Sequence, residues 1–279
     1  MNLQNILAEI EKVDPEVYQR LDTRRNTMRR FAFAGKVLAA AAVPSALGSM
    51  FKKAYGQMGS SIADVLQFAL TLEHLEAEFY TQAVQESAEL FTPEGLAAFT
   101  TIRDHEVAHV ALLQQTLISL NETPAPKPTF DFTAGGAFAD VFTNYDLLLA
   151  VAQAFEDTGV RAYKGQAANL ISNNVVLEAA LRIHSVEARH AAHLRYMRRN
   201  RPSALVVGNV KPWITGKESG IATDAVQPIY DGEEVTTQAN VQIVNINGQN
   251  ISAAAASEAF DEPLTREQVL AIVTPFLGG

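Results

Sequence analysis

Four long stretches of this sequence place apolar residues at alternating spacings of four and three, the pattern of a helix that buries one face. They cover approximately residues 61–87, 92–120, 144–171 and 173–200. Short links join the first stretch to the second and the third to the fourth, so each pair is expected to form antiparallel neighbours. A segment of more than twenty residues joins the two pairs. This order predicts an all-α fold, a four-helix bundle with one long crossover between its second and third helices.

Capping residues mark where these helices begin and end. Ser61, with Asp64 three residues later, has the pattern of a capping box. Thr92 is a suitable N-cap, and Pro93 follows it at the first helical position, where proline is tolerated. Pro202 ends the fourth stretch because its ring and missing N–H do not fit a helix interior.

The last part of the chain, residues 201–279, has a different composition. Pro, Gly and β-branched residues dominate residues 203–251, with one predicted strand at 239–246 before an Asn-Gly pair. A short final helix is predicted from Thr265, where Gln268 completes a capping box. No residues of this segment have the spacing of metal ligands or of a catalytic nucleophile. We interpret it as an irregular C-terminal extension that serves packing or interaction.

The second and fourth helical stretches carry the same motif. Glu106 and His109 form a Glu-x-x-His pair in one, and Glu187 and His190 form it in the other. In both, an isoleucine stands four residues before the glutamate and a leucine four residues after the histidine. The pair therefore lies on the apolar stripe that faces the bundle interior.

The first and third stretches each place one glutamate on the corresponding stripe. Glu73 is followed by Tyr80, and Glu156 by Tyr163, in both cases seven residues or two helical turns later. These two stretches are offset by 83 residues, and the two Glu-x-x-His stretches by 81. The two halves therefore have the pattern of an internal duplication.

Four glutamates in one core would place four negative charges together, and each costs several kcal/mol to bury without a partner. The alternative, that they are ordinary surface or core residues, leaves this cost uncompensated. Two divalent cations would cancel the charge. Because the donor set is rich in carboxylate and poor in imidazole, it favours iron or manganese over zinc.

The pattern of one glutamate, a Glu-x-x-His, a second glutamate and a second Glu-x-x-His resembles the ferritin-like di-iron superfamily. The bundle resembles the exported bacterial branch of ferritin-like domain proteins, which is related to desiccation-associated proteins. The closing segment AFDEPLTREQVLAIVTPFL is also similar to that branch. The resemblance covers residues 61–200. Because ferritins lack the long C-terminal extension, their cage and mineral store are not implied.

The resemblance implies a set of metal ligands, namely Glu73, Glu106, His109, Glu156, Glu187 and His190. Glu106 and Glu187 would be the bridging and catalytic carboxylates. The two tyrosines, Tyr80 and Tyr163, would hold carboxylates by hydrogen bonds. The implied cofactors are two Fe or Mn ions.

Five further side chains leave alternatives open. Glu76 lies one turn beyond the first glutamate of the pattern and could replace or supplement it. His74 and His105 adjoin implied ligands in sequence, which turns them roughly 100° away on the helix, so we expect them in solvent or between helices. His184 and His193 each lie three residues from the fourth-helix pair and could support the ligands by hydrogen bonds.

The first 56 residues are interpreted as an export signal. They carry a net charge of +4, whereas the remaining residues carry −13. Arg29 and Arg30 precede an apolar stretch at 31–51, and Ala54-Tyr55-Gly56 is a small-x-small triplet suited to signal peptidase. The arginine pair resembles the twin-arginine type of signal. The alternative is a helix that stays attached.

Composition excludes several function classes. The chain has no cysteine, which excludes thiol catalysis, iron–sulfur ligation and disulfides. Its net charge of −9 argues against a nucleic-acid partner, since binding nucleic acid requires a basic face. Lys36 and Pro44 interrupt the apolar stretch of the signal, so no stable membrane span is expected after cleavage.

The sequence therefore predicts a signal at 1–56, a ferritin-like four-helix bundle at 57–200 and an extension at 201–279. The expected function is that of a periplasmic or otherwise exported di-metal oxidoreductase, acting on O2 or peroxide with a reductant under oxidative or desiccation stress. Ferroxidase or catalase-like activity fits this expectation best. The alternative is a non-enzymatic stress or surface protein in which the metal only stabilises the bundle. A homo-oligomer is compatible with either.

Overall fold

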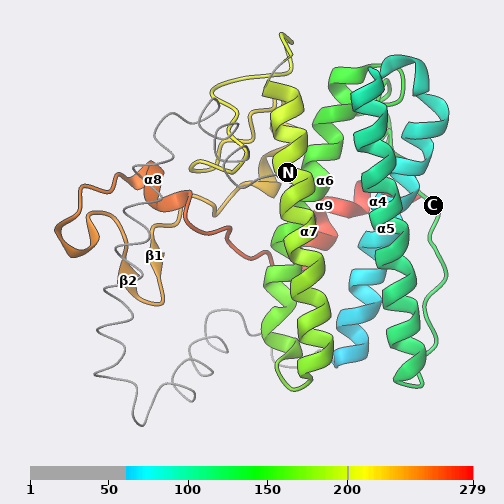
Figure 1. The fold of residues 1–279 in the computed structure, drawn as a ribbon, viewed down its shortest axis with the longest axis horizontal. Coiled ribbons are helices and arrows are strands. Elements are labelled where there is room, and N and C mark those ends of the chain that lie inside the picture. The colour runs from blue at the N-terminus through cyan, green and yellow to red at the C-terminus, as the bar shows by residue number, and fades with distance from the viewer. Residues whose placement is uncertain (1–60, 200, 279) are drawn as a thin grey trace. The chain divides into compact units, whose positions relative to one another are not determined.

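The computed structural model describes residues 61–199 and 201–278, and the predicted signal at 1–56 lies outside these ranges. Within them, four long helices form in the predicted order (Figure 1). Their bounds are α4 Ile62–Glu86, α5 Pro93–Ser119, α6 Tyr145–Gln166 and α7 Asn174–Arg199. Short 3₁₀ helices follow two of them, η1 Ala88–Leu90 after α4 and η2 Ala167–Leu170 after α6. The predicted all-α bundle is confirmed.

Side chains cap the helices where the sequence places capping residues. Ser61 Oγ accepts a hydrogen bond from the Asp64 amide at 3.0 Å, and the Asp64 carboxylate accepts one from the Ser61 amide at 3.0 Å. Thr92 Oγ1 accepts a hydrogen bond from the Gly95 amide at 3.1 Å. Each such cap stabilises its helix by about 1 kcal/mol. These hydrogen bonds fix the ends of α4 and α5, and with them the register of the residues on their buried stripes.

A polar layer divides the apolar core of the bundle. α4 packs along α5 and α6 along α7, and further contacts join α4 to α6 and α5 to α7. Apolar side chains form two clusters, one containing Ile102 and Leu194 and the other Leu113 and Ile183. On both α5 and α7, the Glu-x-x-His pair lies between residues of the two clusters. The core thus holds its polar residues at one level of the bundle.

The long crossover, residues 121–144, is fastened to the end of the chain. The Asp131 amide donates a hydrogen bond to the Phe276 carbonyl at 2.8 Å. The rings of Phe138 and Phe276 lie parallel, with centroids 5.8 Å apart. The aromatic residues of the crossover therefore serve packing.

The C-terminal extension is irregular, as predicted, but only residues 241–242 of the strand predicted at 239–246 form a strand. Two residues of β1, Thr237–Gln238, pair antiparallel with two of β2, Val241–Gln242. Ala239 and Asn240, inside the predicted strand, form the turn with φ of 49° and 66°. Val241 is 48% exposed, so this run has no buried face that would hold a longer strand. The other elements are η3 Asp224–Ile229, η4 Ile246–Gly248, α8 Ala253–Ser257, α9 Arg266–Val273 and η5 Thr274–Phe276.

Buried polar contacts hold the extension against α6 and α7. Every residue of α6 from Leu148 to Tyr163 is buried, because the extension covers the side that the bundle leaves open. Arg195 donates a hydrogen bond to Asp157 Oδ2 at 2.6 Å, and Tyr230 Oη donates to the same oxygen at 2.7 Å. Each of these polar side chains is buried and has a partner, as buried polar groups require. The last helix, α9, also packs on α6 and starts at the predicted Thr265 capping box.

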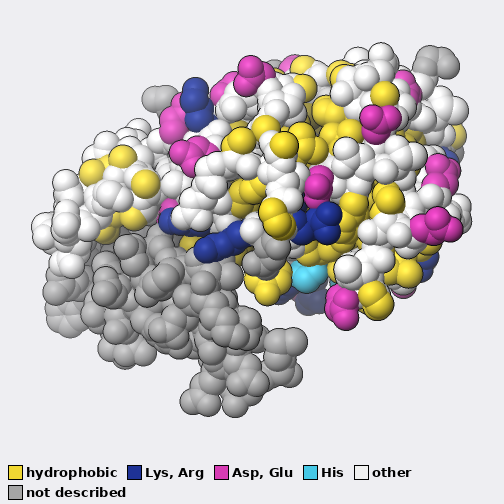
Figure 2. Space-filling model, turned by 90° about the horizontal axis from the view of Figure 1, so that it is seen from above, with side chains coloured by type: hydrophobic (Ala, Val, Ile, Leu, Met, Phe, Trp, Pro, Cys, Tyr) yellow, Lys and Arg dark blue, Asp and Glu magenta, His cyan; other side chains and the backbone are white. Residues whose placement is uncertain are grey.

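The described surface mixes residue types. Figure 2 shows a face on which acidic and basic side chains are interspersed with apolar ones. Large apolar side chains are exposed on α5 and α7, namely Val107, Leu112, Ile118, Val175 and Leu181. The homo-oligomer stays a prediction, because exposed side chains alone do not show a second copy of the chain.

None of the helices in the described ranges has the length and apolar character needed to cross a membrane.

Candidate metal centre

Six side chains from the four long helices meet in the polar layer. They form two overlapping groups, and within each group the ligand atoms lie within 4.8 Å of one another. One group is Glu73, Glu106, His109 and Glu187, and the other is Glu106, Glu156, Glu187 and His190. These are the six residues that the sequence predicted as metal ligands. All are buried, and the four glutamates are 0% exposed.

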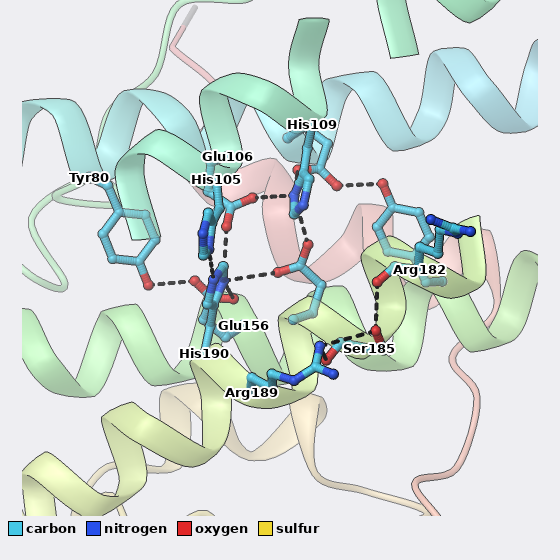
Figure 3. Close-up of polar contacts among 12 residues, drawn as sticks. Tyr80, His105, Glu106, His109, Glu156, Arg182, Ser185, Arg189 and His190 are labelled. Carbon is cyan, nitrogen blue, oxygen red and sulfur yellow. Dashed lines mark hydrogen bonds and ion pairs between the residues drawn. The ribbon is translucent and has the colours of Figure 1, made fainter. Parts of the chain in front are cut away.

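Glu106 and Glu187 belong to both groups. Glu106 Oε2 lies 2.9 Å from His109 Nδ1, and Glu106 Oε1 lies 2.9 Å from His190 Nδ1 (Figure 3). Glu187 is placed similarly, with Oε1 3.2 Å from His109 Nδ1 and Oε2 3.6 Å from His190 Nδ1. Each of these carboxylates thus offers one oxygen to each half of the site.

The two remaining glutamates each belong to one half. Glu73 Oε2 lies 3.2 Å from His109 Nδ1, and Glu156 Oε2 lies 3.2 Å from His190 Nδ1. The halves are related as the internal duplication predicts, with one unshared glutamate and one histidine each.

Two tyrosines hold the unshared glutamates. Tyr80 Oη donates a hydrogen bond to Glu156 Oε1 at 2.6 Å, and Tyr163 Oη donates one to Glu73 Oε1. Both tyrosines are buried. Each tyrosine therefore reaches across from α4 or α6 to the glutamate of the other half. The predicted hydrogen bonds are present, and the crossing ties the two halves together.

The donor set fits a cation better than it fits protons. A ring nitrogen carries at most one hydrogen, yet each histidine Nδ1 faces oxygens of three carboxylates. Among the described residues, Glu106 Oε1 and both oxygens of Glu187 are buried without a hydrogen bond of acceptable geometry. Leaving such an acceptor unpaired costs about 1–3 kcal/mol, and more when it is charged. A divalent cation would satisfy several of these oxygens at once.

Without a metal, protons must neutralise the cluster. Burial raises the pKa of Glu73 to about 8, and burial together with the neighbouring carboxylates raises the pKa of Glu187 well above its ordinary value. Burial opposes ionisation of Glu106 as well, but the close imidazoles of His109 and His190 outweigh it and lower the Glu106 pKa to about 2. Burial disfavours the charged form of His190, yet Glu156 and Glu106 raise its pKa to about 12. Metal binding would therefore release protons from these carboxylates and imidazoles.

A fifth buried carboxylate, Glu76, lies beside the cluster. It is 3% exposed, and its Oε2 has no hydrogen-bond partner among the described residues. Burial, and then the charges of Glu187 and the other carboxylates, raise its pKa well above the ordinary value. The 83-residue offset places Gly159 opposite it in the duplication, and a Cβ added there would lie 3.2 Å from Glu76 Oε1. Glu73 belongs to one of the two four-residue groups and Glu76 to neither, so Glu76 does not replace it, and the glycine at position 159 leaves room for the Glu76 side chain.

The remaining histidines are placed unevenly. His105 Nδ1 lies 2.9 Å from His190 Nε2, so this exposed residue contacts a predicted ligand. His74 is buried on α4, near Lys127 and Glu78 of a surface ion pair.

Neither histidine beside the fourth-helix pair has its described contacts in the cluster. His184 Nδ1 lies 2.9 Å from the Val160 carbonyl, and the His193 ring stacks on Tyr196. His105 lies between helices, as one of the two expectations had it, but its hydrogen-bond distance to His190 was not predicted. The apolar stripe gives no signal for it, because His105 points roughly 100° away from Glu106 on its own helix.

A small apolar cavity lies next to one half of the site. Its volume is about 20 Å³, and its lining includes Ala69, Leu113, Tyr163 and Ala180 from the four long helices. Tyr163 forms part of the wall and donates its hydrogen bond to Glu73. A cavity of this size and lining holds about one small molecule and disfavours water.

Comparison with known proteins agrees with this geometry. A search among curated proteins finds no match. Residues 61–200, which are half of the chain and include all four long helices, match the family model described as a ferritin-like domain. The match ends where the bundle ends and does not include the extension. The bundle also has the buried acidic cluster and the two Glu-x-x-His helices described above. Because the family model matches half of the chain, the chain belongs to the ferritin-like domain family.

Proposed function

We propose that the cluster binds two divalent ions of iron or manganese and that the loaded protein reduces O2 or peroxide, with electrons from a reductant. The observation that carries this proposal is the pair of four-residue groups that share Glu106 and Glu187. Four carboxylates contribute a charge of −4, which two divalent cations balance. Six carboxylate or imidazole ligands without sulfur favour iron or manganese.

Each proposed position has its own histidine and glutamate. His109 and Glu73 hold one, and His190 and Glu156 hold the other, while Glu106 and Glu187 contact both. The tyrosine hydrogen bonds fix the rotamers of the unshared glutamates, as outer partners of metal ligands commonly do.

The chemistry follows from the pairing of two positions. When bound, two such ions can each give one electron, so that O2 or peroxide is reduced in two-electron steps. Glu106 and Glu187 are the proposed catalytic carboxylates because they contact both positions. The complete burial of the glutamates excludes bulk water from the reacting atoms. The apolar cavity beside Tyr163 suits a small apolar molecule, which favours O2 over peroxide as the oxidant.

Metal analysis and turnover test this proposal. Protein purified from cells supplied with iron or manganese should contain about two ions per chain and consume O2 or peroxide. Glu106→Gln keeps the side chain's size but removes one charge from both positions. It should weaken binding of at least one ion by more than about tenfold and abolish turnover, with the helical circular dichroism unchanged.

Glu178→Gln is the matched control, because Glu178 is an exposed residue of α7 that pairs with Arg182. It should leave metal content and turnover unchanged. Wild-type protein that binds neither iron nor manganese contradicts the proposal. Protein that binds two ions, melts lower after chelation and consumes neither O2 nor peroxide supports a purely structural role for the metal instead.

We also propose that the protein is exported and acts in oxidative or desiccation stress, as the exported branch does. The support is the charge and apolar pattern of residues 1–56. The twin-arginine route carries folded proteins, which suits a protein loaded with metal before export. Changing Arg29 and Arg30 to lysine should retain the protein in the cytoplasm, and the mature chain should begin near Gln57. Recovery of an intact Met1 from the exported fraction would contradict cleavage.

A further inference from the structure

The two halves of the site differ outside their ligands. His105 on α5 directly precedes Glu106, and its Nδ1 lies 2.9 Å from Nε2 of His190 on α7. The ring planes are within 13° of parallel, and the centroids are 5.2 Å apart. Because the centroids are so much farther apart than the nitrogens, the two rings face each other edge to edge. Figure 3 shows His105 beside His190. This geometry directs the nitrogen lone pair of one ring at the hydrogen of the other.

The hydrogen bond has a defined direction when His190 is a ligand. His190 Nδ1 faces Glu106 and Glu156, so Nδ1 is the nitrogen that would bind a metal ion. A ring nitrogen binds metal through its lone pair, and in a neutral imidazole the other nitrogen then carries the hydrogen. His190 Nε2–H therefore donates to His105 Nδ1. The hydrogen bond selects this tautomer and fixes the ring orientation.

The duplication offers no equivalent for the other half. The 81-residue offset that relates Glu106 to Glu187 relates His105 to Val186. An aliphatic side chain has no atom that can accept a hydrogen bond from His109. The two proposed metal positions are thus chemically inequivalent, although their ligand sets match.

We propose that His105 is a positioning residue for His190. The metal position of His190 and Glu156 therefore depends on this contact, which has no counterpart at the position of His109 and Glu73. This inference rests on the proposed function, because it requires that the cluster bind metal. Among the described residues, the hydrogen-bond contact of His105 is with His190 and not with the carboxylates of the cluster. It acts through the tautomer and orientation of one ligand.

Two variants separate the hydrogen bond from the bulk of the ring. His105→Phe keeps an aromatic ring but removes the acceptor. His105→Asn keeps an acceptor near the position of Nδ1, since the Asn side-chain oxygen occupies a similar place. Val186→Ala is the matched control, because it changes the corresponding residue on α7 without removing a hydrogen bond.

The test is titration of the metal-free full chain with Mn²⁺, followed by calorimetry and by electron paramagnetic resonance. Wild type should bind two ions. His105→Phe should weaken one of the two positions by about 10–100-fold, the usual effect of removing an outer partner of a metal ligand, and leave the other within twofold. At one equivalent, its spectrum should show isolated Mn²⁺ rather than a coupled pair. His105→Asn should restore most of the lost affinity, and Val186→Ala should match wild type.

The possible failures are distinguishable. If His105→Phe binds both ions as wild type does, or if His105→Asn is as weak as His105→Phe, the positioning role is wrong while the proposed function stands. If His105→Phe loses both positions together, the asymmetry is wrong. Wild-type protein that binds no Mn²⁺ contradicts the proposed metal centre itself. Circular dichroism of each variant should show the same helix content. If His105→Phe has lost its helices, His105→Gln takes its place, because its longer side chain does not hold an acceptor at the position of Nδ1 and should also weaken one position.

Discussion

Glu76 and Gly159 show how two single residues fit one another across a duplicated site. Glu76 is buried among carboxylates, and the equivalent position on α6 is a glycine that faces it. A Cβ at Gly159 would lie 3.2 Å from Glu76 Oε1, which is closer than ordinary van der Waals contact, and 3.5 Å from Glu187 Cγ. Glycine inside a helix costs up to about 1 kcal/mol relative to alanine. The cost is offset by the space that the extra carboxylate requires.

This fit predicts a coupling between the two residues. In a Glu76→Ala background, Gly159→Ala should raise the free energy of unfolding by up to about 1 kcal/mol, because the helix gains propensity and the close contact is gone. In the wild-type background, the same change should be neutral or destabilising, because the buried carboxylate must move. A double-mutant cycle measured by denaturant unfolding of the metal-free protein gives the coupling. Equal effects of Gly159→Ala in both backgrounds would show that the contact is not strained.

At this scale, helical spacing was sufficient to predict the residues of the buried cluster and the two tyrosines that hold its unshared glutamates, but not the contact of His105. Glu106 and His109 could be identified because their partners recur at fixed offsets on an apolar stripe. The contact of His105 could not, because it depends on which face of α5 approaches α7, and no spacing within α5 carries that information. Its contact with His190 spans 85 residues of sequence. Gly159 could have been found by applying the 83-residue offset to Glu76.

At the scale of the elements, α6 and the C-terminal extension approach each other closely at Gly165. A Cβ added at Gly165 would lie 1.9 Å from the carbonyl oxygen of Leu264, which is backbone and cannot rotate away. The Leu264 amide donates a hydrogen bond to the Arg161 carbonyl at 3.1 Å, which fixes the chain in that place. Gly165→Ala should therefore destabilise the protein by about 1–3 kcal/mol, as overpacking does.

The sign of that change is the diagnostic result. Helix propensity alone would make Gly165→Ala stabilising by up to about 1 kcal/mol. Thermal unfolding gives the sign, and hydrogen exchange at the Leu264 amide reports whether the extension has lifted from α6. Protein that is stabilised, with the Leu264 amide still protected, would show that the extension does not lie against Gly165.

The helices were predictable because their signals are local, and the extension was not because its contacts are distant. Ser61 and Thr92 act within their own first turns. The contact of Tyr230 with Asp157, in contrast, spans 73 residues and joins two polar side chains that have no periodicity in common. The strand predicted at 239–246 is only two residues long for a related reason, since the run contains β-branched residues but has no buried face to pack.

For the molecule as a whole, the buried cluster makes stability depend on what neutralises it. In the metal-free protein, His190 is held protonated by its carboxylates, with a pKa of about 12 against an ordinary 6.5. Burial holds Glu73 protonated, with a pKa of about 8 against an ordinary 4.5. Both groups bind more protons in the folded chain than in the unfolded chain between pH 6.5 and 8. The contribution of Glu106 has the opposite sign, but it is lost only as the pH falls from 4.5 towards 2, outside this window.

The free energy of unfolding of the metal-free protein should therefore fall as the pH rises from 6.5 to 8, because the unfolded chain then binds fewer protons than the folded one. His190 contributes stability that is complete below pH 6.5 and lost towards pH 12, and Glu73 contributes stability that is complete below pH 4.5 and lost towards pH 8. Metal-loaded protein should show the reverse, because bound cations replace these protons and metal binding tightens as the pH rises. Melting temperatures of chelated and Mn²⁺-loaded protein, measured from pH 6 to 8.5, check both slopes. The metal-induced rise in melting temperature should grow with pH. If the metal-induced rise in melting temperature stays constant over this range, metal binding displaces no protons. The buried carboxylates and imidazoles of the metal-free cluster would then not be neutralised by protons.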